Sequence, residues 1–416
     1  MRPKLSLPLV LAGLASSFSA GALADDSSID EVVVTGQVLY RDQLNALKTP
    51  TPIIDVPQSV VVISSEQIES RGYTSITDIV NYVPGLNSSQ GEGHRDSVVF
   101  RGVRSTADFF VDGVRDDVQY YRPLYNLEQV EVLKGPNALL FGRGGTGGVL
   151  NRVTKKGVLG EAFTQIGGSI DTFGGASVQV DRNIDINENT ALRVNAFYES
   201  LENHRDFFDG DRLGINPTLT LELTEATTVD LSYEYLDHER FIDRGIPTGS
   251  DGRPVEAFQD IVFGDPQLNT TTLEAHLLKA MLQHRSSDDI KGNFSVFYGD
   301  YDKLYQNFYA SGYDQATTPD QVTLDGYVDT TQRENLVLSG NAVAQFAAGS
   351  LTHTLLFGAE YIDTTSNQDR YNAYWDTTLD DNEFFAVNRP LALSQGVGVN
   401  ISGNATRNDF TSQLND

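Results

Sequence analysis

Cysteine is absent from this chain of 416 residues, and methionine and tryptophan are scarce, with two and one copies. Without cysteine the protein has no disulfide framework, no thiol nucleophile and no cysteine-ligated metal site. The six histidines are scattered, and no two of them stand at the spacing of metal ligands. No Ser/His/Asp set or carboxylate pair has an interpretable spacing either. The sequence therefore predicts no catalytic residues, no enzyme activity and no metal or cofactor of the protein's own.

Basic residues are also few. The chain has 30 Lys and Arg against 57 Asp and Glu, a formal net charge of −27. Binding to nucleic acid needs clustered Lys and Arg that neutralise phosphates, so nucleic acid is not expected as a partner.

Long hydrophobic runs are missing after the first residues. The chain starts with Arg2 and Lys4, continues through an apolar stretch from 5 to 14 and reaches Ala22-Leu23-Ala24. This order predicts a secretory signal peptide at 1–24, cleaved before Asp25. Its apolar core is too short to cross a bilayer. An exported chain without membrane-spanning helices is either soluble or a β-barrel.

Two glycine-containing motifs are the strongest local signals. Residues 130–142 read as a strand, a Gly-Pro turn and a short apolar segment, and 147–155 read as a further strand. The intervening loop 142–147 could be taken for a phosphate-binding fingerprint. That motif requires a helix directly after the glycines, whereas residues 149–154 alternate and are β-branched. Upstream, 100–102 (Phe-Arg-Gly) and 110–116 each place a strand end against a tight turn.

From about Glu161 the sequence alternates between apolar and polar residues in segments of roughly ten. On 212–223, for example, leucines and an isoleucine alternate with Gly214, Asn216, Thr218 and Thr220. A soluble sandwich would give the same alternation. The connections decide between the two, because short and long ones alternate strictly, as in outer-membrane barrels. The expected strands are 162–170, 176–183, 190–201, 212–223, 227–238, 271–283, 290–303, 331–346 and 351–364, with long loops at 202–211, 239–270, 304–330 and after 365.

The motifs between Thr51 and Lys156 together resemble the plug domain of TonB-dependent outer-membrane receptors, in the form found in ferric-siderophore receptors. The resemblance implies an α+β plug domain at 50–157 inside an antiparallel transmembrane β-barrel of about 22 strands. Residues 161–416 would form the first part of the barrel, with only about 9–10 of its strands. The chain therefore looks like a truncated receptor. The implied location is the outer membrane of a Gram-negative bacterium, with membrane lipid around the barrel.

The segment 25–49 contains an acidic pair and three consecutive valines, which favour an extended strand. From the residues alone a plain edge strand explains it equally well. The resemblance makes it a TonB box and linker, which would pair as an added β-strand with the periplasmic energy transducer. The residues of this box are Asp30, Glu31, Val32, Val33, Val34 and Thr35.

By the same resemblance, the ligand touches the outward apices of the plug. Arg would neutralise anionic oxygens of a ferric siderophore, and Tyr would add flat amphipathic contact. The iron would arrive as part of this ligand. The expected substrate-binding residues are Arg95, Arg104, Gln119, Tyr120, Tyr121 and Arg122.

Three functions stay open at this stage. The first is energy-coupled import of ferric siderophores, which the box, plug and barrel pattern favour together. The second is import of another large nutrient, such as a cobalamin, haem or an oligosaccharide, on the same scaffold. The third is a passive plugged pore without energy coupling.

Overall fold

The computed structural model describes residues 58–373 and 382–386, except positions 90, 107, 136–146 and 266–267. All of these belong to one compact unit, Gly36–Asp416. The predicted signal peptide at 1–24 and the predicted TonB box and linker at 25–49 lie outside the described residues, as does nearly all of the glycine loop 142–147. None of the helices among the described residues is long and apolar enough to span a membrane.

The region 58–157, called the plug below, opens with a strand and two short helices. Helix α1 (Ser65–Arg71) begins at Ser64, whose side chain accepts from Gln67 N–H while the Gln67 side chain accepts from Ser64 N–H. Helix α2 (Ile76–Asn81) begins at Ser75 with the same arrangement. Gly72 ends α1 at φ 65°, a left-handed conformation that glycine adopts without strain. Both short helices therefore begin at a serine that caps their first turn.

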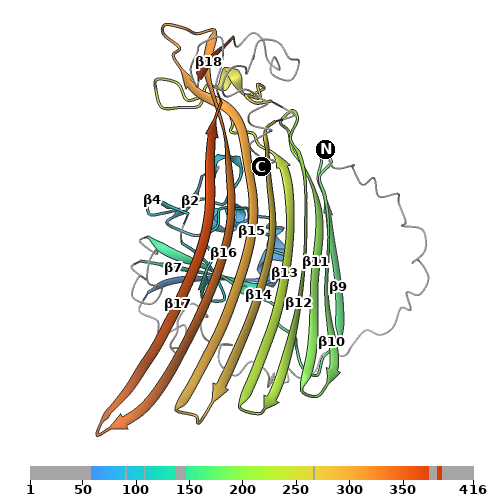
Figure 1. The fold of residues 1–416 in the computed structure, drawn as a ribbon, viewed down its shortest axis with the longest axis vertical. Helices are drawn as coiled ribbons and strands as arrows, with labels where there is room; N and C mark the ends of the chain where they lie inside the picture. The colour runs from blue at the N-terminus through green and yellow to red at the C-terminus, as the bar shows by residue number, and fades with distance from the viewer. Residues whose placement is uncertain are drawn as a thin grey trace, which may run out of the picture. The chain divides into compact units, whose positions relative to one another are not determined.

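Two small sheets complete the plug (Figure 1). The larger is mixed and has the order β1-β7-β8-β5-β6, with β5 parallel to β8. Strand β8 follows the glycine loop where a phosphate-binding motif would need a helix, so that alternative is wrong. The strands of the two sheets are β1 (Ser59–Ser64), β5 (Phe109–Val111), β6 (Val114–Arg115), β7 (Leu127–Lys134) and β8 (Gly148–Thr154), and β2 (Leu86–Ser88), β3 (Val98–Phe100) and β4 (Val103–Ser105).

The second half of the chain forms one long antiparallel sheet in sequence order from β9 to β17, with β18 beside part of β16. All nine predicted strands are present, as β9 to β17, and β18 is an additional strand. The bounds of the ten are β9 (Phe163–Ile170), β10 (Ala176–Asn187), β11 (Thr190–Glu202), β12 (Asp209–Thr224), β13 (Thr227–Phe241), β14 (Thr270–Arg285), β15 (Ile290–Tyr313), β16 (Gln321–Ala348), β17 (Leu351–Asn372) and β18 (Asn382–Ala386).

Connections at the two ends of the long sheet differ in length. At one end the strands are joined by the short segments 188–189, 225–226, 286–289 and 349–350. The other end carries 171–175, 203–208, 242–269 and 314–320. This confirms the predicted alternation, but the expected loop 304–330 is wrong. Most of it is strand, because β15 and β16 continue as a paired hairpin to Tyr313 and Val322.

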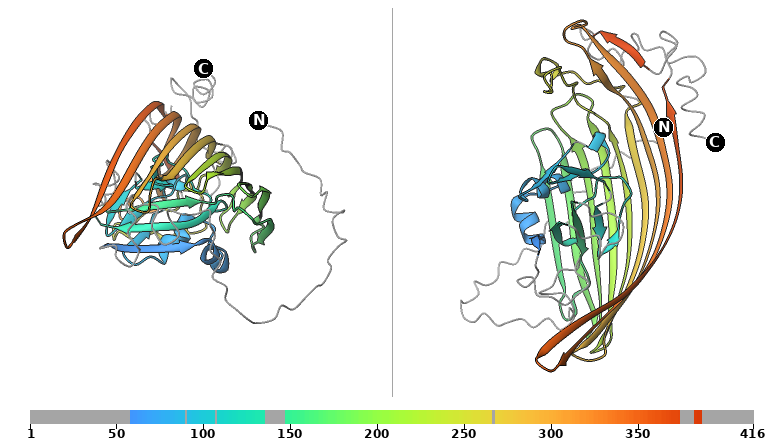
Figure 2. Two further views of the ribbon diagram at one scale, coloured as in Figure 1. Left: turned by 90° about the horizontal axis from the view of Figure 1, so that it is seen from below. Right: turned by 90° about the vertical axis from the view of Figure 1, so that its left-hand side faces the viewer.

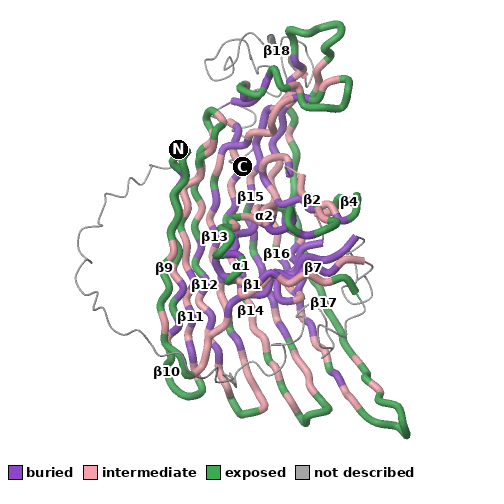
Figure 3. The backbone as a smooth tube through the Cα atoms, turned by 180° about the vertical axis from the view of Figure 1, so that it is seen from behind, coloured by how far each residue is buried: buried purple, intermediate pink, exposed green. Residues whose placement is uncertain are grey.

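The two faces of the long sheet differ in chemistry, as β12 shows. Gly214, Asn216, Thr218 and Thr220 are buried, while the intervening leucines and Ile215 are partly or fully exposed. The plug lies along the face that carries the buried small and polar residues of β12 (Figure 2). The residues of the long sheet that are buried are concentrated in the middle of the strands (Figure 3). Strands β9 and β17 do not pair with each other, so the described strands form an open sheet.

Candidate functional site

The plug is held against the long sheet by buried ion pairs. Lys155 contacts Asp181 at 2.9 Å, and Lys156 contacts Asp230 at 2.8 Å. Tyr125 and Asn126 donate to the Glu234 carboxylate at 3.1 and 3.0 Å. Pairing is what makes such charges tolerable out of water, so these contacts fix the position of the plug against the sheet.

Lys279 interrupts an apolar stretch of β14, as a residue at a β-bulge could do. The pairing of β14 with both neighbours is continuous, so there is no bulge. Lys279 lies on the plug-facing side with Leu273, Ala275 and Leu277, and its ammonium binds Asp112 of the plug. Apolar residues occupy this face because they pack on the plug core. A simple pattern of polar residues toward the plug and apolar residues toward lipid does not predict this arrangement.

Inside the plug, four polar side chains form a buried network around one carboxylate. The Asp116 carboxylate accepts from Arg122 at 2.8 Å, from Arg152 at 2.6 Å and from the Tyr120 hydroxyl at 2.9 Å. Arg122 also donates to three backbone carbonyls and stacks 4.0 Å from the Phe109 ring centroid. Burial and the neighbouring Asp116 raise the pKa of Tyr120, so its hydroxyl stays protonated. The network cross-links 96–122 to strand β8.

A tight turn forms the part of the plug that points toward the long connections. Gly91, Glu92 and Gly93 are consecutive and all have positive φ, at 63°, 56° and 78°. A side chain at Gly93 would come within about 3 Å of Ile242, so glycine is needed there for space as well. The turn is tied to the sheet because Tyr305 Oη donates to the Glu92 carbonyl at 3.0 Å.

His94 follows this turn and is enclosed by charged groups. Its Nδ1 lies 2.5 Å from Nζ of Lys303, and its ring stacks on Tyr305 with centroids 3.9 Å apart. Its Nε2 lies 2.8 Å from Nη1 of Arg95 and 3.7 Å from the Glu92 carboxylate. Burial, aided by Lys303, lowers the pKa of His94 to about 3, so the ring is neutral at neutral pH. The nearby His94, together with the charges of Arg95 and Arg244, in turn lowers the pKa of Glu92 to about 2.

Above His94 opens a cavity of about 600 Å³, called the apex pocket below. The plug contributes its floor, and β15, β16 and β17 contribute its wall, on the half of these strands nearer the long connections. Its lining is unusually rich in charged and aromatic side chains: Glu92, His94, Arg95, Asp117, Val118, Gln119, Lys303, Tyr305, Tyr327, Asp329, Thr330, Thr331, Arg333, Gln368, Asp369 and Arg370.

The expected ligand residues fall into three groups. Arg95 and Gln119 line the apex pocket, and Arg95 donates to Gln119 Oε1 at 2.8 Å. Tyr120 and Arg122 are each 1% exposed and point into the plug, so in this conformation they offer nothing to a ligand. The remaining two lie outside the pocket lining. Arg104 is exposed on β4, and the ring of Tyr121 is covered by Arg240 of β13 at 3.6 Å.

Sequence reasoning missed the sheet's share of the pocket, namely Lys303, Tyr305, Tyr327, Arg333 and Arg370. Three of these fall in 304–330 or after 365, which were expected to be loops. Residues 304–313 and 366–372 show no regular apolar–polar alternation, so no signal in the sequence could have revealed Tyr305 or Arg370. Within the described part of the chain, no three His, Asp or Glu side chains are grouped to hold a metal ion.

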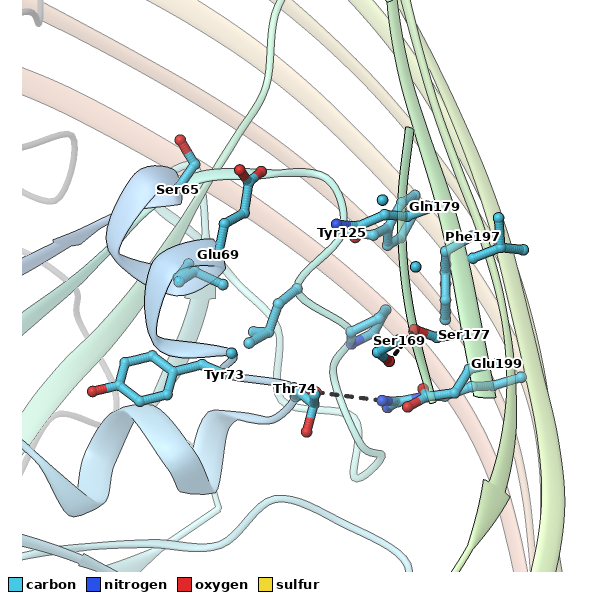
Figure 4. Close-up of a pocket in the computed structure, with 18 of the residues that line it drawn as sticks. Ser65, Glu69, Tyr73, Thr74, Tyr125, Ser169, Ser177, Gln179, Phe197 and Glu199 are labelled. Atoms are coloured by element: carbon cyan, nitrogen blue, oxygen red, sulfur yellow. Dashed lines mark hydrogen bonds and ion pairs between the residues drawn. The ribbon is translucent and has the colours of Figure 1, made fainter. Parts of the chain in front are cut away.

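A second cavity, of about 430 Å³, separates α1 from strands β9 to β12 (Figure 4). Small residues dominate its sheet side, where Ser169 and Ser177 are hydrogen-bonded at 2.7 Å. Arg212 reaches across it to donate to the Thr74 carbonyl at 3.3 Å. None of the expected ligand residues lines this cavity, so the apex pocket is the better candidate for a ligand site.

A small domain packed on one face of a long antiparallel sheet, with polar residues inward and apolar residues outward, defines a plugged outer-membrane receptor. Comparison with known proteins agrees. Residues 52–149 match the family described as "TonB-dependent Receptor Plug Domain". The chain belongs to the TonB-dependent receptor family, whose members reside in the Gram-negative outer membrane.

Among curated relatives, the chain is 28% identical to the "Probable TonB-dependent receptor BfrD" of Bordetella pertussis, over 88% of the chain and 50% of the relative. It is 30% identical to the "Catecholate siderophore receptor Fiu" of Escherichia coli K12, over 54% of the chain and 30% of the relative. The crystal structure of the siderophore receptor PiuA from Acinetobacter baumannii superposes with a TM-score of 0.76 at 26% identity, covering 86% of this chain and 53% of that one. The chain thus spans about half the length of these relatives or less.

Proposed function

We propose that the receptor containing this chain takes up ferric siderophores across the outer membrane, driven by a TonB-type transducer in the periplasm. The observation that carries the proposal is the apex pocket, which is built jointly by the plug and the sheet. A ligand held there touches both parts at once, so its binding can change how firmly the plug is held.

The lining of the apex pocket supports a ferric chelate as the ligand. Arg95, Arg333 and Arg370 supply guanidinium groups that suit the negatively polarised oxygens around iron. Tyr305 and Tyr327 supply aromatic surface on which the organic part of a chelate can pack. Relatives named as siderophore receptors favour this substrate over a cobalamin, haem or an oligosaccharide.

Energy coupling would use the segment 30–35, which we propose to be the TonB box. Its valines would add a strand to the transducer through main-chain hydrogen bonds. The box lies upstream of β1, which among the described strands pairs with β7 alone. A pull on the box therefore reaches the plug first at a strand with a single described partner.

The test changes Val33 to Pro in the receptor that contains this chain. Proline removes a backbone N–H and cannot complete the added strand, so uptake of the radiolabelled ferric siderophore should stop. Binding to whole cells should persist, because the pocket lies elsewhere. Gln43→Pro, in the linker, is the matched control and should leave both unchanged. Undiminished uptake by the Val33 variant contradicts energy coupling, and failure of every ferric siderophore to bind contradicts the proposed substrate.

A further inference from the structure

Most of the cations in the apex pocket already have a carboxylate partner. Arg370 makes a two-pronged contact with Asp329, with both distances 2.6 Å. Arg333 contacts the two carboxylate oxygens of Asp117 at 2.8 and 3.0 Å. These four side chains therefore form two closed pairs that together carry no net charge.

The turn 91–93 on the floor of the apex pocket also pairs a carboxylate with arginines. Glu92 lies 3.0 Å from Arg95 and 3.7 Å from Arg244, which follows β13. Arg244 is also occupied on its other side, where its guanidinium stacks 3.7 Å from the ring centroid of Tyr309. The Arg95 guanidinium is further engaged by Gln119 and His94.

Lys303 is the exception in the described part of the pocket. Its ammonium binds His94 Nδ1 and the Gln119 carbonyl, both at 2.5 Å, and no carboxylate. Lys303 is itself buried, so its charge is directed to these neutral groups beneath the pocket surface. In the described lining of the pocket, a ligand therefore meets several carboxylates and very little unbalanced positive charge.

Ferric siderophores differ sharply in charge. Iron(III) bound by three hydroxamates is a neutral complex, because each hydroxamate carries one negative charge. Iron(III) bound by three catecholates is a trianion, because each catecholate carries two. A trianion in this pocket would lie beside Glu92, Asp117 and Asp329 or would have to displace them from their arginines. Like charges placed against each other are an effective means of rejecting a partner.

Given that the apex pocket binds a ferric chelate, as proposed above, we propose that it selects chelates near electrical neutrality, of the trihydroxamate charge class, over trianionic tris-catecholates. The paired carboxylates Asp117 and Asp329 act as the specificity-determining residues. Neutral polar groups at the same surface, on Gln119, Gln368, Thr330 and Thr331, suit the carbonyl and amide groups of a neutral chelate.

The experiment measures binding of two probes to the purified receptor that contains this chain. Ferrichrome serves as the neutral ferric trihydroxamate and ferric enterobactin as the trianionic tris-catecholate. Ferrichrome should bind at least about tenfold more tightly at physiological ionic strength. The difference should narrow as salt is raised, because screening weakens the repulsion between ligand and carboxylates.

Asp329→Asn releases Arg370 from its partner and removes one negative charge from the wall. Binding of ferric enterobactin should tighten by about tenfold, while binding of ferrichrome should change much less. Asp117→Asn, which releases Arg333, is a second and independent variant with the same expectation. Asp300→Asn is the matched control, because Asp300 is exposed on β15 outside the pocket lining and the variant removes the same charge.

The outcomes separate this inference from the function on which it rests. Tighter binding of ferrichrome, with the shift in both Asn variants and none in the control, supports it. Equal or tighter binding of ferric enterobactin by the unmodified receptor overturns the charge selection but leaves siderophore uptake standing. Failure of both chelates to bind also overturns the charge selection, and the proposed function falls only if every other ferric siderophore fails to bind as well.

Discussion

His94 is a histidine that the folded plug keeps uncharged. It is 5% exposed, and the charged or titratable groups facing it are Glu92, Arg95, Lys303 and Tyr305. Because burial and Lys303 lower its pKa to about 3, against 6.5 for an ordinary histidine, the unfolded chain takes up a proton that the folded plug excludes. The stability contributed by neutral His94 is complete above pH 6.5 and is lost as the pH falls below that value.

We therefore predict that lowering the pH from 6.5 to 4.5 destabilises the turn 91–95 by roughly 1 kcal/mol per pH unit. The measurement is hydrogen-exchange protection of these amides, corrected for the intrinsic pH dependence of exchange. Glu92, whose pKa is lowered from 4.5 to about 2, adds at most about 0.4 kcal/mol at the acid end of this window, where the unfolded chain begins to bind its proton. In His94→Asn the protection should therefore depend on pH only weakly. A variant that retained the full pH slope would show that another group titrates.

Residue chemistry in the sequence was a partial guide to the site. Arg and Tyr at the plug apices were predicted to meet ligand, and of these residues Arg95 lines the apex pocket. Its contact with a ligand stays a prediction. Nothing in the local sequence marks Tyr120 and Arg122 as different from the other apical residues. In the structure both are buried and donate hydrogen bonds to the Asp116 carboxylate. Whether an arginine faces solvent or a buried carboxylate depends on tertiary contacts. The burial of these two side chains could therefore not have been predicted from the sequence.

The hairpin of β15 and β16 extends well past the plug and is covered near its tip by the segment 242–265. Phe258 and Phe263 of that segment pack on Val322 and Leu324, which are fully buried. Arg205 fixes the segment from the other side by binding Asp243 at 2.5 Å and the Ile261 carbonyl at 2.7 Å. A segment whose regular structure is limited to one short 3-10 helix (Glu256–Phe258) and one β-bridge is thereby given a fixed position over the hairpin.

Phe263→Ala should detach this segment from the hairpin. Removing a fully buried phenylalanine ring costs about 3–5 kcal/mol, since a cavity replaces its contacts. Limited proteolysis should then cut within 242–265 at least tenfold faster, while the strands remain intact. Phe346→Ala is the control, because Phe346 is 46% exposed on β16. Unchanged cleavage of the Phe263 variant would mean that Arg205 holds the segment without help from this cluster.

At the level of elements, alternation and turn lengths were enough to place all nine predicted strands of the sheet. The errors are in length, at 304–313 and 321–330, where the hairpin continues. There the residues read as a polar, aromatic loop because lipid no longer selects apolar side chains on the outer face. Strand pairing in that region is maintained by backbone hydrogen bonds and by the covering segment, and neither leaves a hydrophobic signature.

Over the whole molecule, the plug and the long sheet are joined by charges that neither part could bury alone. Burial by itself raises the pKa of the Asp112 carboxyl, but the ammonium groups of Lys279 and Lys156 outweigh it, so the pKa is lowered and the group stays ionised. Thr154 of β8 donates to the same carboxylate at 2.7 Å and accepts from Lys279 at 2.8 Å. This contact ties β5, β8 and β14 together at the centre of the interface.

We predict that Lys279→Met loosens the plug from the sheet while both remain folded. The substitution keeps most of the volume but leaves the Asp112 carboxylate buried without its nearest cation, which costs about 3 kcal/mol or more. Amides of β5 and β8 should exchange on the order of a hundredfold faster, since each 1.4 kcal/mol is about a factor of ten. Arg182→Met is the matched control, because Arg182 is exposed on β10. If the exchange of β8 stayed at its original rate, Lys156 and Lys155 would be sufficient to hold the plug. In that case the energy needed to release it would lie in their pairs with Asp230 and Asp181.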